Sequence, residues 1–138
     1  MPSIRRVLET ALYFDDLRQA TEFYCDVLGL RVIARGGSRL VALDAGEATV
    51  LLLFRRGATL GGADTPEGWI PPHDGHGPVH VAFAVAADAI DGWERRLAER
   101  GIAIESHVRW EGGGRSIYFR DPAGHCLELA TPGTWTTY

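Results

Sequence analysis

The strongest constraint on the fold is an internal repeat, because the same order of strand-like and helix-like segments occurs twice along the chain. Gly29 in the first half corresponds to Gly101 in the second at an offset of 72 residues. Leu52 corresponds to Glu128 at an offset of 76, and the glycine-rich loop 110–114 absorbs the four extra residues. Near-constant offsets across a whole unit indicate a duplication.

Each half predicts one strand, one helix and then three strands. Apolar residues alternate with period two in the strands and recur at helical spacing in the helices. Asp16 and Asp88 stand where the two helices are expected to begin, and glycines where they are expected to end. Strands are expected at 7–14, 30–34, 39–43 and 48–54, and again at 79–85, 102–109, 115–119 and 125–130.

This pattern predicts an α+β fold of two tandem βαβββ modules, whose curled mixed sheet surrounds a metal or ligand cavity. The chain is expected to form a single domain, 1–138, with module one at about 5–54 and module two at about 79–132. The intervening segment, about 55–78, is rich in Gly and Pro and predicts a linker or a lid.

The two most informative residues are His80 and Glu128, which lie within predicted strands. Alternation places both on the face opposite the apolar residues Phe83 and Leu127. An imidazole and a carboxylate among apolar strand residues are unfavourable unless each finds a partner or a metal ion. Glu9 is the first-half counterpart of His80, at an offset of 71.

Composition excludes several classes of protein. The formal net charge is −4 and no basic stripe is present, which argues against nucleic-acid binding. The longest purely apolar run, 50–54, is far too short for a membrane span. No secretory signal is visible, and Cys25 and Cys126 are isolated, as is typical of a reducing compartment. A cytoplasmic protein is therefore expected.

The chain resembles the vicinal oxygen chelate superfamily, which includes glyoxalase I, extradiol dioxygenases, fosfomycin-resistance enzymes and bleomycin-resistance binding proteins. The resemblance covers nearly all of residues 5–132. It rests on three stretches: 11–17 (ALYFDDL), 80–85 (HVAFAV) and 118–125 (YFRDPAGH). It implies one divalent metal ion, a small molecule with vicinal oxygens as substrate, and a homodimer.

By this resemblance, four strand positions hold metal ligands, and here they are Glu9, Leu52, His80 and Glu128. Leu52 cannot bind a metal, so a site of three ligands is implied. Two carboxylates and one imidazole suit Zn²⁺, Fe²⁺, Mn²⁺, Ni²⁺, Co²⁺ or Mg²⁺. The two histidines and one carboxylate of extradiol dioxygenases are not reproduced.

Catalytic roles follow from the same resemblance. Glu9 or Glu128 would both bind the metal and move a proton, or His73 would act as the base. Ser116 and Tyr118 share a strand face and match positions of substrate contacts in the fosfomycin-resistance branch.

Several alternatives stay open. His80 alone could be a structural histidine, and Glu9 could be a buried carboxylate paired with an arginine such as Arg39. Isomerase, lyase, transferase and oxygenase chemistries all occur on such a scaffold. The main rival to a metal-dependent enzyme is a metal-free protein of the bleomycin-resistance kind, which sequesters a cationic drug; the negative charge and Leu52 favour it.

Overall fold

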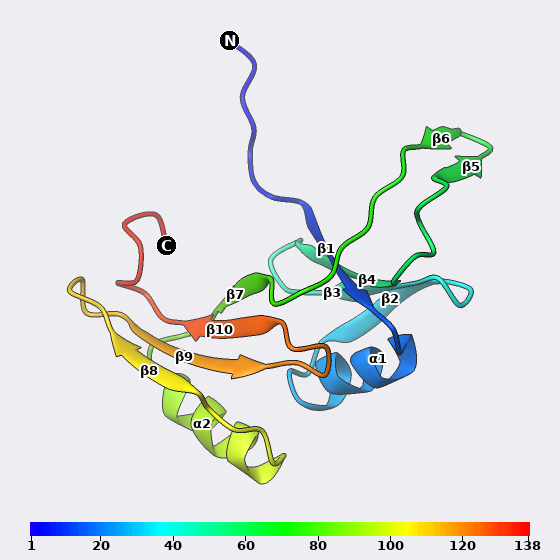
Figure 1. The fold of residues 1–138 in the computed structure, drawn as a ribbon. Helices are drawn as coiled ribbons and strands as arrows, with labels where there is room; N and C mark the ends of the chain where they lie inside the picture. Colours follow the sequence, from blue (N-terminus) through cyan, green and yellow to red (C-terminus); the bar gives the residue numbers. More distant parts are fainter. The chain divides into compact units, whose positions relative to one another are not determined.

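A computed structural model describes all residues, 1–138, as two compact units, Met1–His76 and Gly77–Tyr138 (Figure 1). Each unit contains one four-stranded mixed sheet and one helix in the order βαβββ, which confirms the predicted fold class. Neither helix has the length and apolar character needed to span a lipid bilayer.

The sheet of the first unit has the strand order β1-β4-β3-β2, in which β1 and β4 are parallel and the other neighbours antiparallel. Its elements are β1 (Glu9–Phe14), α1 (Leu17–Asp26), β2 (Arg31–Gly36), β3 (Leu40–Asp44) and β4 (Val50–Arg55).

The helix α1 begins and ends as the sequence predicts. The Asp16 side chain accepts a hydrogen bond from the Gln19 backbone N–H at 2.9 Å, which caps the first turn. Gly29 follows the helix with a φ of 74°, a conformation that glycine adopts without strain. Tyr24 of α1 is fully buried, as are Leu12 and Leu53 of the sheet, so one face of the sheet forms the core.

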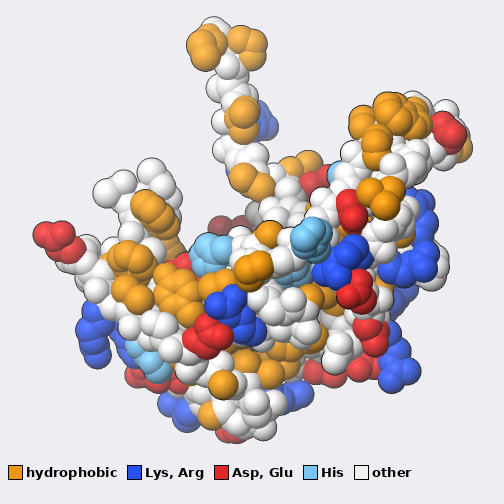
Figure 2. All heavy atoms as spheres, in the orientation of Figure 1, with side chains coloured by type: hydrophobic (Ala, Val, Ile, Leu, Met, Phe, Trp, Pro, Cys, Tyr) orange, Lys and Arg blue, Asp and Glu red, His pale blue; other side chains and the backbone are white.

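The segment that joins the repeats contains a short hairpin, β5 (Ala63–Thr65) and β6 (Gly68–Ile70). Large apolar side chains of this segment are exposed, including Leu60, Trp69 and Ile70. Apolar side chains also lie along the extended residues that precede β1 (Figure 2).

The sheet of the second unit has the order β7-β10-β9-β8, with β7 and β10 parallel and the other neighbours antiparallel. Its elements are β7 (His80–Ala84), α2 (Ile90–Glu99), β8 (Ser106–Arg109), β9 (Arg115–Arg120) and β10 (Cys126–Ala130).

Two details of the second unit differ from the prediction. The residue that caps α2 is Ala89 and not Asp88, because the chain reaches the helix through a turn in which Ala89 N–H donates to the Ala86 carbonyl. The strand expected at 102–109 is shorter, because Ile102 N–H still donates to the helix carbonyl of Leu97, so pairing with β9 begins later.

The strand registers confirm the duplication residue by residue. In each unit the polar residue that begins the first strand faces the last strand at the same point: Glu9 opposite Val50, and His80 opposite Cys126. Two residues further along the last strand stand Leu52 in the first unit and Glu128 in the second. Leu52 therefore occupies the position that Glu128 occupies in the second repeat.

Candidate functional site

The second unit brings the predicted site residues His80, Glu128, Ser116 and Tyr118 onto one face of its sheet. In β9 and β10, Tyr118 stands directly opposite Glu128, and both point to the side on which His80 lies. The other face is covered by α2, to which Arg115 is joined by ion pairs (Figure 1). The alternation predicted from the sequence is therefore present in this sheet.

The His80 ring is held in one orientation by the backbone. Its Nδ1 lies 2.8 Å from the carbonyl oxygen of Cys126. A carbonyl only accepts, so Nδ1 carries the proton of the neutral ring and Nε2 presents a lone pair. That Nε2 lies 3.2 Å from Oε2 of Glu128. Two acceptors at this distance repel each other unless a proton or a cation lies between them.

Glu128 is a buried carboxylate that forms no ion pair with an arginine. The residue is only 5 % exposed, and its Oε1 atom has no hydrogen-bond partner. A buried carboxylate oxygen without a partner costs free energy, on the order of 1–3 kcal/mol or more for a charged group. The arrangement favours a cation that both Glu128 and His80 can approach.

Tyr118 lies beside His80 and Glu128 on the open face of the sheet. Its ring lies nearly parallel to that of His80, with the ring centres 6.1 Å apart. Burial raises the pKa of Tyr118, and the neighbouring Glu128 carboxylate raises the pKa further, whereas the nearby Ser116 hydroxyl lowers it. Tyr118 is therefore a neutral donor at physiological pH.

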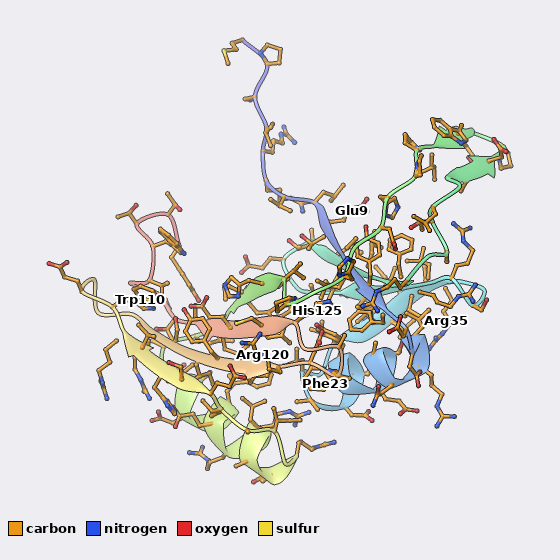
Figure 3. The ribbon with its side chains drawn as sticks, in the orientation of Figure 1. Glu9, Phe23, Arg35, Trp110, Arg120 and His125 are labelled. Carbon is orange, nitrogen blue, oxygen red and sulfur yellow. The ribbon has the colours of Figure 1, made fainter.

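Glu9 belongs to the first unit, where it lies at the start of β1 (Figure 3). It is exposed and forms no ion pair with Arg39, so the alternative of a buried pair is wrong. Neither unit by itself gathers three or more His, Cys, Asp or Glu side chains suited to a metal. The set of Glu9, His80 and Glu128 stays a prediction.

His73, the predicted base, also lies in the first unit. Its Nδ1 is 2.6 Å from the hydroxyl of Tyr13, and its ring packs edge-on against Phe54. The same ring lines a cavity of about 180 Å³, together with Arg39, Leu40, Phe54, Thr59 and Pro71. Burial raises the pKa of Tyr13, and the nearby Asp74 carboxylate raises it further. The catalytic role of His73 stays a prediction.

One contact on the open face of the second unit was not predicted. The indole Nε1 of Trp110 donates a hydrogen bond to Oγ of Ser116 at 2.7 Å. The sequence did contain a signal, because Trp110 lies two residues before three consecutive glycines, Gly112 to Gly114, and the strands on either side pair as a hairpin, with Val108 opposite Ser116. His125 is a buried turn residue, with Nδ1 at 2.7 Å from Oδ2 of Asp121.

Comparison with known proteins supports the assignment of the fold. A solved structure of lactoylglutathione lyase from Agrobacterium tumefaciens superposes with a TM-score of 0.87 and is 34% identical, covering 98% of this chain and 99% of that one. An integron cassette protein from a metagenome of Halifax Harbour Sewage Outfall shares the fold at a TM-score of 0.74 and 23% identity, covering 93% of this chain and 99% of that one.

The chain is also similar in sequence to two transferases. The chain is 31% identical to the glutathione transferase FosA of Serratia marcescens over 118 residues, which cover 86% of this chain and 74% of that protein. It is 38% identical to the metallothiol transferase FosB of Bacillus licheniformis over 60 residues, which cover 43% of this chain and 38% of that protein.

The sequence profile of one family matches residues 6–129, and thus both repeats together with the segment between them. The chain belongs to the Glyoxalase/Bleomycin resistance protein/Dioxygenase superfamily.

Proposed function

We propose that the chain is a divalent-metal-dependent enzyme that acts on a small molecule with adjacent oxygen atoms. The observation that carries this proposal is the His80–Glu128 pair, in which Nε2 of His80 lies 3.2 Å from a buried carboxylate oxygen. Two donor atoms bound to one metal at right angles lie roughly 3 Å apart, given metal–ligand distances of about 2.1 Å. The spacing of the pair fits that requirement without rearrangement.

The residues that would hold the metal are His80 through Nε2, Glu128 through its carboxylate, and Glu9 as the predicted third ligand. The unpartnered Oε1 of Glu128 supplies a second oxygen from the same side chain. One nitrogen and several oxygens suit Mn²⁺, Fe²⁺, Mg²⁺, Co²⁺, Ni²⁺ or Zn²⁺. The Cys126 carbonyl that binds Nδ1 of His80 is the outer partner expected of a metal-binding histidine.

A bound ion would polarise adjacent substrate oxygens and stabilise the negative charge that develops on them. The protein side chains would supply the remaining functions. Tyr118, whose ring lies beside His80, forms a wall for the substrate, and Ser116 lies on the same face. Proton transfer falls to Glu9, to Glu128 or to His73, each of which we propose as a base.

The relatives indicate which reaction to test first. Their names include a glutathione transferase, metallothiol transferases and fosfomycin resistance proteins, and the similar solved structure is a lactoylglutathione lyase. We therefore propose a thiol-dependent modification of an oxygen-rich small molecule, and we expect ring cleavage to be absent. Glutathione with fosfomycin and glutathione with methylglyoxal are the substrate pairs to try.

Metal analysis of protein purified without a chelator tests the site. We expect about one divalent ion per chain, lost in His80→Ala and in Glu128→Ala while circular dichroism shows an intact fold. Undiminished metal in the double variant would contradict the proposed site. Tight calorimetric binding of a bleomycin-type drug by metal-free protein would instead support sequestration, the function that Leu52 favours.

We further propose that the protein is a homodimer. The exposed apolar side chains of the β5–β6 hairpin and of the residues before β1 are a surface that a second copy could cover, among them Ile4, Val7, Trp69 and Ile70. Sedimentation velocity at micromolar concentration measures this directly; a monomer at all concentrations would contradict it.

A further inference from the structure

A groove that the proposed function does not use lies on the first unit, between α1 and the β2–β3 hairpin. Its volume is about 420 Å³. One wall is formed by side chains one helical turn apart on α1, and the other by the end of the hairpin. Arg35 and Val41 stand opposite each other in β2 and β3, so both point to the face of the sheet that packs against α1. The groove therefore opens on that face, and Glu9 lies on the other.

Two arginines give this groove its positive charge. Arg35 is exposed at the end of β2, beside α1, and forms no ion pair (Figure 3). Arg18 on α1 donates its Nε proton to Glu22 at 3.0 Å, which leaves both terminal NH₂ groups without a protein acceptor. Burial and Asp26 raise the pKa of Cys25 on α1, and the charge of Arg35 opposes them. The charge of Arg35 is therefore felt on the helix side of the sheet.

Uncharged donors and an apolar floor complete the groove. Gly37 and Ser38 form the tip of the hairpin, and neither backbone N–H has an acceptor in the protein. The Ser38 hydroxyl is exposed at the same tip. Thr21 already donates its hydroxyl proton to the Leu17 carbonyl at 2.7 Å. The apolar part of the lining consists of the side chains of Leu17 and Val41.

The charges of the lining favour an anion. Its one acidic side chain is Glu22, which Arg18 holds, so two positive charges face one negative charge in a chain whose formal net charge is −4. A guanidinium group matches the geometry of a phosphate, to which it donates two parallel N–H bonds. A phosphate group alone would leave most of the groove empty. The size and the apolar floor therefore favour a phosphate that carries an organic group.

We propose that this groove is a binding site for a small phosphate monoester. Arg18 and Arg35 bind the phosphate oxygens, and the Ser38 hydroxyl donates to one of them. The organic part of the ligand lies on Leu17 and Val41. The site shares no residue with the proposed metal site, so each can be tested without the other.

Phenyl phosphate is the probe, titrated into the full chain and followed in ¹H–¹⁵N spectra. We expect saturable shifts of the Gly37 and Ser38 amide signals. Arg35→Gln should weaken binding by about five- to tenfold, because it removes a charge-assisted contact at an exposed site. The matched control is Arg109→Gln, which removes an exposed, unpaired arginine from the edge strand β8 of the second unit and should bind as the unaltered protein does.

Glu22→Gln should change the affinity in the opposite direction. It frees Arg18 and removes the negative charge from the lining, so phenyl phosphate should bind about two- to threefold more tightly. Glu67→Gln removes an equal charge from an exposed turn of the same unit and should leave the affinity unchanged. An equal gain in both variants would mean that only the net charge of the protein matters, and would overturn the site.

Two further ligands test the chemical class. Inorganic phosphate should shift the same signals with lower affinity, because it has no organic group to cover the apolar floor. Benzoate should also bind more weakly, because it carries a single negative charge; binding as tight as that of phenyl phosphate would overturn the phosphate assignment. Unsaturated or absent shifts at Gly37 and Ser38, or equal affinities of Arg35→Gln and Arg109→Gln, would overturn the site itself. Circular dichroism of each variant verifies that the fold is intact.

Discussion

The two units share a strand order and a register, but their open sheet faces carry different chemistry. In the second unit the register positions hold His80 and Glu128, which lie 3.2 Å apart. In the first unit the corresponding positions hold Glu9 and Leu52, which cannot form such a pair. The two units have the same strand order and register, but one carries a polar pair and the other a carboxylate beside a leucine. The chemistry of the site is therefore determined by the residues at these two positions and not by the fold.

The units also differ in an ion pair, and this difference has no consequence for the chemistry of the site. Each unit has an ion pair at the second and third strands of its βαβββ repeat: Arg31 with Asp44 across β2 and β3, and Arg120 with Glu105 at the edge of β8 and β9. The acid and the base have changed strands between the repeats. Both units have an ion pair at this place, but the strand that carries the acid differs. This is expected for a pair that stabilises a strand edge and takes no part in the chemistry.

The largest expected effect comes from giving the second unit the apolar residue of the first. Glu128→Leu removes the buried carboxylate while retaining an apolar fill, so metal content should fall from about one ion per chain to near zero. Catalytic turnover should fall by at least about 100-fold, in line with the loss of a direct metal ligand. The matched control is Leu52→Met in the first unit, which should change neither; equal losses in both variants would show that the units are not chemically distinct.

The second largest effect is expected from a core substitution that should destabilise both units alike. Leu53 and Leu129 are buried and follow Leu52 and Glu128 in their strands. Replacing either by Ala should lower the free energy of unfolding by about 2–5 kcal/mol through lost burial and a residual cavity. Urea denaturation measures both values. A loss confined to one unit would show that the repeats do not share the same packing.

The sequence predicted the features that follow from local periodicity and missed those that depend on a neighbour. Alternation in β7 and β10 correctly assigned His80 and Glu128 to one face, and the acidic residues before Leu17 correctly predicted where α1 begins. The bond from Trp110 to Ser116 crosses a hairpin, so no period along one strand reveals it. Glu9 belongs to the other unit, so its predicted role as a third ligand does not follow from periodicity along any one strand.

The third prediction gives the first unit the carboxylate of the second. If the four repeat-related positions serve one metal, Leu52→Glu should add a ligand and tighten Mn²⁺ binding by about tenfold, which corresponds to about 1.4 kcal/mol. The stoichiometry should remain one ion per chain in calorimetry. An additional ion with no change in the first affinity would mean that the first unit forms a separate site, and weaker binding would mean that Leu52 lies away from the metal.

The smallest expected effect concerns the exchanged ion pairs. The side-chain hydrogen bond from Arg120 lowers the pKa of Glu105, and a backbone hydrogen bond from Gly46, followed by that from Arg31, lowers the pKa of Asp44. A lowered pKa in the folded state stabilises the protein above the unfolded pKa, and this contribution is lost as the pH falls through the folded value. Glu105→Gln and Asp44→Asn should each lower Tm slightly at pH 7, and the difference in Tm should disappear as the pH falls below the lowered pKa of the folded state, where the carboxyls are protonated. A Tm difference that persists in acid would mean that these side chains stabilise the strand edges by packing and not by charge, and the exchange of acid and base between the repeats would then have no electrostatic meaning.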